Sequence, residues 1–192
     1  MLHLPYNVIL CSASPRRQEL LKTIVPEFEI RIKAVDESFP QNLEAEGIAL
    51  FLALHKAKAF EDEIRPGELM ITADTIVWLR DKALNKPSDR DDAIRMLTAL
   101  SGQEHRVYTG VCVFTKEKKK LFFGMTRVFF KPLSSAEIEY YVDHYAPYDK
   151  AGAYGAQDFI GMVGVEKLDG GFYNVMGLPM KELYEELQHF DD

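Results

Sequence analysis

Cysteine and tryptophan are scarce in this sequence of 192 residues, which holds two cysteines and one tryptophan. Cys11 and Cys112 lie far apart, without C-x-x-C spacing, in apolar runs typical of strands. This pattern favours buried free thiols in a reducing compartment over a disulfide or a zinc site. Long hydrophobic runs are also missing, because residues 48–54 fall far short of the roughly 20 residues of a membrane-spanning helix. With no export signal visible, we expect a cytoplasmic protein without a membrane partner.

An excess of positive charge is absent too. Lysine and arginine number 23 against 30 aspartates and glutamates, which gives a formal net charge of −7. Proteins that bind duplex nucleic acid usually carry a basic excess, so we expect no nucleic-acid partner, although a local cationic pocket for a small anion remains compatible with this charge. An apolar content of 47% and a charged content of 28% are ordinary for a globular protein, and the length suits one domain over residues 1–192.

Several widespread catalytic motifs are missing. The sequence contains no G-x-x-x-x-G-K-[ST], G-x-G-x-x-G, G-x-S-x-G or H-E-x-x-H, which excludes the usual phosphate loop, dinucleotide fingerprint, serine-hydrolase elbow and zinc-protease helix. The five histidines have no metal-ligand spacing. Any phosphate or metal chemistry must therefore use another arrangement of residues.

Hydrophobic periodicity indicates a mixture of strands and helices. Short apolar runs and period-two alternation predict strands at residues 7–11, 28–34, 69–79, 106–115, 121–130 and 159–167. Capping signals and helical periodicity predict helices that begin near residues 14–15 and 134–135, and helices over residues 45–62, 91–100 and 179–189. Residues 69–79 fit one strand or two strands joined at 73–74, and residues 146–158 are expected to form an ordered loop. The sequence therefore predicts an α/β fold with a twisted mixed sheet, flanking helices and a cleft.

A candidate polyphosphate site follows the first predicted strand. Ser14 and Pro15 are typical of a helix N-cap and first helical position, and residues 12–17 place hydroxyls and guanidinium groups beside the positive end of that helix. Arg16 and Arg17 would by themselves be ordinary surface residues. Positive charge at a helix N-terminus is unfavourable by about 0.3–1 kcal/mol, however, and the forked donors of arginine match phosphate oxygens, so an anion explains the pair better.

Acidic residues form a second candidate group. Asp74 lies within an apolar strand, where an unpaired carboxylate would cost several kcal/mol, so it must meet a cation, a metal or water in a cleft. A strand-end aspartate that caps a turn is the simpler alternative. Asp36 and Glu37 follow another predicted strand and could complete a hard-cation site with Asp74, although either alone would more simply belong to an acidic loop.

Two lysines and one loop complete the candidates. Lys56 and Lys86 are candidate phosphate contacts, although most lysines are simply solvated. The segment 148–157 sets small residues around fixed polar ones and ends at Gln157. Small residues allow the backbone to approach a ligand closely, and a tight structural turn is the alternative.

These stretches together resemble the Maf family of nucleoside triphosphate pyrophosphatases, also described as septum-formation-inhibitor-like proteins. The matching segments cover nearly the whole chain in order: SASPRR (12–17), VDE (35–37), the helix with Lys56, ADT (73–75), KP (86–87), SGQEHRVYTGV (101–111), DKAGAYGAQ (149–157) and NVMGLP (174–179). No single segment is specific, but the combination of SASPRR, ADT and DKAGAYG is.

The resemblance implies an inosine triphosphate pyrophosphatase-like fold (Maf/Ham1) with two lobes around a cleft. It implies hydrolysis of a nucleoside triphosphate to the monophosphate and pyrophosphate with a divalent cation, Mg²⁺ or Mn²⁺, as cofactor. It makes Asp74 the proton acceptor that activates water and, with Glu37, a metal-associated residue. The other implied roles are substrate specificity for Arg16, Thr75 and Gln157, and phosphate binding for Ser12, Arg17, Lys56 and Lys86. A homodimer is expected from the family alone.

The loop around Gln157 resembles the branch of the family that acts on dTTP and UTP rather than on 7-methyl-GTP. A glutamine amide can donate to a pyrimidine carbonyl and accept from the ring N3–H, which thymine and uracil share and cytosine lacks. The chain departs from the family pattern at Asp158, where glycine is usual, and at residues 170–172, where Gly-Gly-Phe replaces Gly-Ser-Tyr. The alternative function is a nucleotide-binding regulator of cell division or septum formation without significant turnover.

Overall fold

The computed structural model describes residues 2–192 and contains one twisted sheet in the strand order β2-β1-β3-β5-β6-β7, with β4 paired to β3. The strands are β1 (Asn7–Leu10), β2 (Glu29–Ile30), β3 (Glu68–Leu79), β4 (Lys82–Leu84), β5 (Glu104–Phe114), β6 (Lys119–Phe130) and β7 (Val165–Gly170). β1 runs parallel to β2 and β3, and the other pairs are antiparallel. The expected mixed α/β sheet is thereby confirmed.

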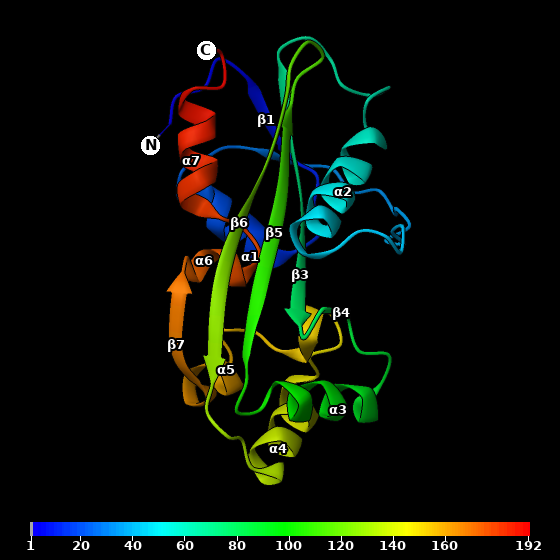
Figure 1. Cartoon of the computed structure of the whole chain (residues 1–192). Coiled ribbons are helices and arrows are strands. Elements are labelled where there is room, and N and C mark those ends of the chain that lie inside the picture. Colours follow the sequence, from blue (N-terminus) through cyan, green and yellow to red (C-terminus); the bar gives the residue numbers. More distant parts are fainter. Residues whose placement is uncertain (1) are drawn as a thin grey trace.

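Helices flank the sheet in two groups (Figure 1). They are α1 (Pro15–Lys22), α2 (Ala45–Lys58), α3 (Arg90–Leu100), α4 (Ser135–Tyr145), α5 (Phe159–Gly164), α6 (Phe172–Met176) and α7 (Met180–Gln188), with a 3₁₀ turn η1 at Ala151–Ala153. α3, α4 and α5 gather at one end of the long strands, while α1, α2 and α7 lie nearer the other end. β3, β5 and β6 extend through both groups, so the two lobes share one sheet.

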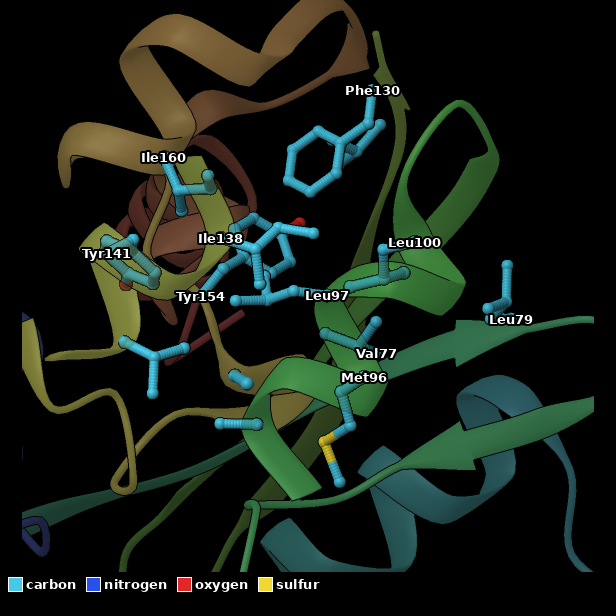
Figure 2. Close-up of a cluster of buried hydrophobic side chains, with 14 of the residues drawn as sticks. Val77, Leu79, Met96, Leu97, Leu100, Phe130, Ile138, Tyr141, Tyr154 and Ile160 are labelled. Carbon is cyan, nitrogen blue, oxygen red and sulfur yellow. The ribbon is translucent and has the colours of Figure 1, made fainter. Parts of the chain in front are cut away.

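Each lobe has its own hydrophobic cluster. Figure 2 shows the cluster of the α3–α4–α5 lobe, where Leu97 and Leu100 from α3 meet Ile138 and Tyr141 from α4 and the ring of Tyr154. At the other end, the buried side chains of α1 and α7 pack against one face of the sheet, and α2 covers the opposite face. The cleft lies between these two regions of packing.

Local sequence signals explain the starts of α1 and α4. Ser14 caps α1 by accepting a hydrogen bond from the Arg17 amide, with proline at the first helical position. Ser134 and Glu137 form the predicted capping box at the start of α4. Both cysteines are buried free thiols, and burial raises the pKa of each to about 12, so they are structural rather than nucleophilic. None of the helices within residues 2–192 combines the length and apolar composition that crossing a membrane requires.

Three predicted elements were wrong or too long. Residues 28–34 were expected to form a half-buried strand, but β2 holds only two residues and Ile32 is 62% exposed. β1 has four residues and offers β2 only a short partner. Residues 159–167 were expected to form a strand, but α5 occupies 159–164 before β7 begins, because a short apolar run does not distinguish the two structures. The predicted helix over 45–62 ends at Lys58, and residues 69–79 belong to one continuous strand.

Candidate active site

A pocket of about 470 Å³ opens where the sheet has a gap. One edge of β3 pairs with β1 as far as Ile71, and with β4 only from Val77 onward. Residues 72–76 of β3 therefore have no strand beside them on that edge, and the pocket lies past the carboxyl end of β1, a common ligand position in α/β sheets. The volume is within the range of small-molecule sites.

Nine of the site residues expected from the sequence line this one pocket. They come from the loop after β1, the start of α1, the segment before α2, α2 itself, β3, the segment after β4 and the loop after η1: Ser12, Arg16, Arg17, Glu37, Lys56, Asp74, Thr75, Lys86 and Gln157. Residues far apart in the sequence thus meet at a single site, which the order of the motifs did not reveal.

Close packing of α2 on the sheet brings Lys56 to Asp74. A Cβ on Gly110 would lie 2.3 Å from the carbonyl oxygen of Ala49, so glycine allows the helix to approach β5. The Thr72 hydroxyl donates to the carbonyl of Ala53 at 2.7 Å, which fixes the register of α2 against β3. Lys56 is farther along the same helix, and its ammonium group forms an ion pair with the Asp74 carboxylate.

Glu37 links the lysines at this end of the pocket. Lys56 Nζ lies 2.8 Å from Glu37 Oε1, and Lys86 Nζ lies 2.7 Å from Glu37 Oε2. Burial raises the pKa of Glu37, but the hydrogen bonds from Lys56 and Lys86 outweigh this and lower it to about 2. Glu37 is therefore ionised at neutral pH. Asp74 is 8% exposed, and its partner Lys56 removes the cost of an isolated buried carboxylate.

Glu37 and Asp74 provide suitable ligands for a divalent cation. Their carboxylates both reach the Lys56 ammonium, so one small positive group can contact both of them. Magnesium is commonly held by one or two carboxylates together with substrate phosphates, and this pair fits that pattern. Within residues 2–192 no group of three acidic, histidine or cysteine side chains is arranged to hold an ion. The expectation that Asp36 would complete the site was wrong: it is absent from the pocket lining and accepts hydrogen bonds from Ser38 instead.

Arg17 faces the protein rather than open solvent. Its guanidinium group donates to the carbonyl of Ala73 at 2.9 Å, to Thr75 Oγ1 at 3.1 Å and to the carbonyl of Gly177 at 2.8 Å. The Ala73 carbonyl belongs to the part of β3 that lacks a neighbouring strand, so Arg17 replaces a missing ladder partner. Burial lowers the pKa of Arg17, and the Asp74 charge opposes this shift. Arg17 thereby ties α1 to β3 and to the turn after α6.

Arg16 connects the two lobes across the pocket. Arg16 Nη1 lies 3.1 Å from Asp149 Oδ2, and Lys150 Nζ lies 2.8 Å from the other oxygen of Asp149. Burial raises the pKa of Asp149, but the neighbouring Lys150 and Arg16 lower it overall. The start of α1 is thus joined by an ion pair to the loop that carries Gln157.

The far end of the pocket is lined by this loop. The amide oxygen Oε1 of Gln157 is buried and has no hydrogen-bond partner within the described chain. A buried amide oxygen without a partner costs free energy, so it suits a ligand that brings a donor. Tyr154 also lines the pocket, and its hydroxyl lies 2.7 Å from Nε2 of the buried His105. Burial lowers the pKa of His105 to about 3, so the ring is neutral.

Sequence reasoning missed several residues that line or support the site. Asp149, Lys150 and Gly177 line the pocket but were noticed only as letters of longer motifs. Gly177 has a φ of +113°, and a Cβ there would lie 3.5 Å from Arg17 Nε and from Thr75 Oγ1. The glycine in NVMGLP was the available signal for such a turn.

Comparison with known proteins matches the sequence of this chain to one family. The family described as Maf-like protein matches residues 7–190. A dTTP/UTP pyrophosphatase of Bacteroides fragilis (strain YCH46) is 53% identical over 184 residues, which are 95% of each chain. A dTTP/UTP pyrophosphatase of Parabacteroides distasonis is 49% identical over 186 residues, which are 96% of each chain.

A solved structure supports the architecture alone. The Ham1 protein of Staphylococcus aureus superposes with a TM-score of 0.50 at 14% identity, covering 93% of this chain and 98% of that chain. At such low identity the likeness concerns the arrangement of the sheet and helices, which agrees with the expected fold class.

Proposed function

Because this chain belongs to the Maf family, we propose that its pocket hydrolyses dTTP and UTP to the nucleoside monophosphate and pyrophosphate. Relatives of about half-identical sequence that cover nearly the whole chain carry the name dTTP/UTP pyrophosphatase, which supports this substrate class. The observation that carries the proposal is the single pocket itself, which sets lysines and carboxylates at one end and the unpartnered Gln157 oxygen at the other.

The charged end suits a triphosphate. Lys56, Lys86 and Arg16 supply positive charge that would offset the negative charge of the phosphates and of the attacking oxygen. Lys56 and Lys86 are paired with carboxylates, so a bound polyphosphate would exchange one set of anionic partners for another. Arg17 would act on this end by fixing Ala73 and Thr75 beside Asp74.

Asp74 is the proton acceptor of the proposed reaction. Its carboxylate lies in the pocket wall, where it could take a proton from the water that attacks the α-phosphorus, with pyrophosphate leaving. Glu37 and Asp74 are the residues that would hold a divalent cation, Mg²⁺ or Mn²⁺. Such an ion, when bound, supplies charge neutralisation of the phosphates and lowers the pKa of a coordinated water.

Base selection is assigned to Gln157. Its Oε1 atom could accept the N3–H of thymine or uracil, and its amide group could donate to a ring carbonyl. Cytosine has no N3–H, whereas the methyl group that separates thymine from uracil is discriminated by only about 1–3 kcal/mol. The pocket is therefore expected to accept both dTTP and UTP.

A panel of nucleoside triphosphates tests this function. Purified protein is incubated with dTTP, UTP, dCTP, dATP or dGTP, each with Mg²⁺ and with Mn²⁺, and pyrophosphate and orthophosphate are measured separately. We expect pyrophosphate release that is fastest with dTTP and UTP. Tight binding of dTTP without product would favour the alternative of a nucleotide-binding regulator of cell division, and orthophosphate release would contradict the proposed bond cleavage.

Three features of the surroundings belong to the same proposal. We assign residues 1–192 to one domain, since β3, β5 and β6 run through both lobes. A cytoplasmic setting fits the free thiols and nucleotide substrates.

We also propose a homodimer through β6, where Leu121, Phe123 and Met125 are about two-fifths exposed on one face. Analytical ultracentrifugation should give twice the mass of 21.9 kDa, and Phe123→Lys should halve it. A monomeric wild type at micromolar concentration would refute the dimer.

A further inference from the structure

A tyrosine hydroxyl from α4 holds the loop that ends at Gln157. The side chain of Tyr141 is fully buried, and its oxygen accepts a hydrogen bond from the Gly155 amide at 3.2 Å. The same hydroxyl donates to Asp158 Oδ2 at 2.8 Å. Burial raises the pKa of Tyr141, and the Asp158 charge adds to this, so the hydroxyl keeps the proton that it donates. Figure 2 shows Tyr141 in the same lobe core as Tyr154 and Ile160.

These contacts fix the backbone on both sides of Gln157. Gly155 is two residues before Gln157, and Asp158 is the next residue after it. The Asp158 amide also donates to the Gly155 carbonyl at 3.1 Å, which closes the loop on itself. A Cβ on Gly155 would lie 2.5 Å from Asp158 Oδ2 and 3.0 Å from Gln157 Nε2, so both side chains pack directly against this glycine. The backbone that carries Gln157 is therefore held in place on both sides.

The charge of Asp158 is balanced inside the loop. Lys150 Nζ lies 3.7 Å from Asp158 Oδ2, and both side chains are largely buried. Asp158 does not line the pocket, whereas its neighbour Gln157 does. The Asp158 carboxylate is thus turned away from the pocket and toward Tyr141 of α4.

We propose that Tyr141 and Asp158 are positioning residues that hold Gln157 in the orientation for reading the pyrimidine base. This rests on the proposed function, because it assigns base selection to Gln157. The pair acts only through the loop, since neither side chain lines the pocket. Loosening the pair is expected to affect the choice between bases more than the hydrolysis of a bound nucleotide.

Tyr141→Phe removes the hydroxyl and keeps the ring in the lobe core. We expect the ratio of kcat/KM for dTTP over dCTP to fall about tenfold, the size of one weakened specific contact. Most of the change is expected in KM, with kcat for dTTP within about threefold of wild type. Tyr108→Phe is the matched control, because Tyr108 is also a buried tyrosine but packs under α2, and its ratio should stay unchanged. A uniform loss over all nucleotides would show a merely structural role and overturn the proposal.

Variants of Asp158 keep the test decisive if Tyr141→Phe does not fold. Asp158→Asn retains an oxygen that accepts from Tyr141, so it should keep the wild-type ratio, whereas Asp158→Ala should lower it, by less than Tyr141→Phe, which also removes the acceptor of the Gly155 amide. The double variant Tyr141→Phe/Asp158→Ala should fall no further than Tyr141→Phe alone, because that variant has already removed the contact between the two side chains. Equal ratios in Asp158→Ala and wild type would overturn the proposal.

Equilibrium binding separates this proposal from the proposed function. Calorimetric titration with dTMP and dCMP measures base preference without turnover. If wild-type protein prefers dTMP but releases no pyrophosphate from dTTP, the proposed function fails, while loss of that preference in Asp158→Ala would still support the positioning role. If wild type releases pyrophosphate and Asp158→Ala keeps both preferences, only the positioning role fails.

Discussion

The two ends of the pocket are built on opposite principles. At the charged end, Lys56, Lys86, Glu37 and Asp74 are paired with one another. At the loop end, Gln157 has a buried amide oxygen without a hydrogen-bond partner among the described residues. A ligand at the first end must replace existing ion pairs, whereas a ligand at the second end can satisfy an atom that has no partner.

This difference separates rate from selectivity. Exchange of ionic partners is insensitive to the base, because every nucleoside triphosphate carries the same phosphates. A single unpartnered oxygen is sensitive to the base, because only some bases bring a donor to it. We therefore expect substitutions at the charged end to lower hydrolysis of all nucleotides, and substitutions at the loop end to change their ranking.

Loss of Asp74 should have the largest effect on activity. Asp74→Asn keeps the size of the side chain but cannot accept the proton of water, so kcat for dTTP should fall by at least about 100-fold. An equal fall in kcat for dTTP and for dCTP would show that the charged end sets the rate of hydrolysis and not the choice of base. Asp62→Asn, an exposed aspartate in the turn after α2, is the matched control and should keep the wild-type rate. Near-normal turnover by Asp74→Asn would remove Asp74 from its assigned role.

Loss of Arg17 should have the largest effect on stability. Arg17→Met keeps the length of the side chain but leaves the carbonyls of Ala73 and Gly177 without their donor, so the free energy of unfolding should fall by about 2 kcal/mol or more. Arg90→Met is the comparison, because Arg90 forms an ion pair with Asp143 that is exposed to solvent, and its loss should lower the free energy of unfolding much less than the loss of Arg17. Urea unfolding measures both. Equal losses would mean that Arg17 does not brace the charged end.

Loss of the Gln157 side chain should change selectivity instead of rate. Gln157→Ala should lower the preference for dTTP over dCTP by about tenfold while the two maximal rates change little. Steady-state kinetics with both nucleotides measure this ratio. Equal losses in kcat for both nucleotides would show that Gln157 acts on the rate, as the residues of the charged end do, and would contradict the division between rate and selectivity.

The smallest expected effect is on the stability of the protein and concerns the buried His105, whose ring lies beside the hydroxyl of Tyr154 at the loop end. The pKa of His105 is lowered by burial to about 3, from an ordinary value of 6.5. The unfolded chain therefore binds this proton first as pH falls, so the contribution of His105 to stability is present above about pH 6.5 and is lost progressively toward pH 3. In His105→Phe, the fall in unfolding free energy between pH 7 and pH 5 should be shallower than in wild type. The exposed His144 serves as control, and an unchanged slope in His105→Phe would contradict the buried neutral ring.

Local signals allowed much of the fold to be predicted. Most of β5 is a continuous buried run, β6 alternates between more and less exposed side chains along its length, and the turn between them lies in the charged segment. The side chains of Ser134 and Glu137 each accept a hydrogen bond from the backbone amide of the other residue. The start of α4 is therefore determined by residues within one helical turn and needs no tertiary contact. β2 and α5 were not predictable in the same way. The alternation in 28–34 had no strand of matching length beside it, and α5 depends on Gly161 packing against the Ala156 carbonyl.

The candidate site was predictable as a set of residues but not as a set of contacts. Resemblance to one family named the residues, and all of them line the pocket. That Arg17 would be bonded to Ala73, Thr75 and Gly177 depended on the gap in the sheet beside β3, which no local pattern encodes. Asp158 is a second example. The sequence shows only a charge beside Gln157, and the contact of that charge with Tyr141 is visible only in the fold.

Hydrolysis of dTTP in ¹⁸O-labelled water tests the central claim most directly. Attack of water on the α-phosphorus beside Asp74 forms the new bond to oxygen on the nucleotide side, so mass spectrometry should find the label in dTMP and none in pyrophosphate. Label in pyrophosphate, or dTDP with labelled orthophosphate, would contradict the account, because the water would then have attacked a different phosphorus.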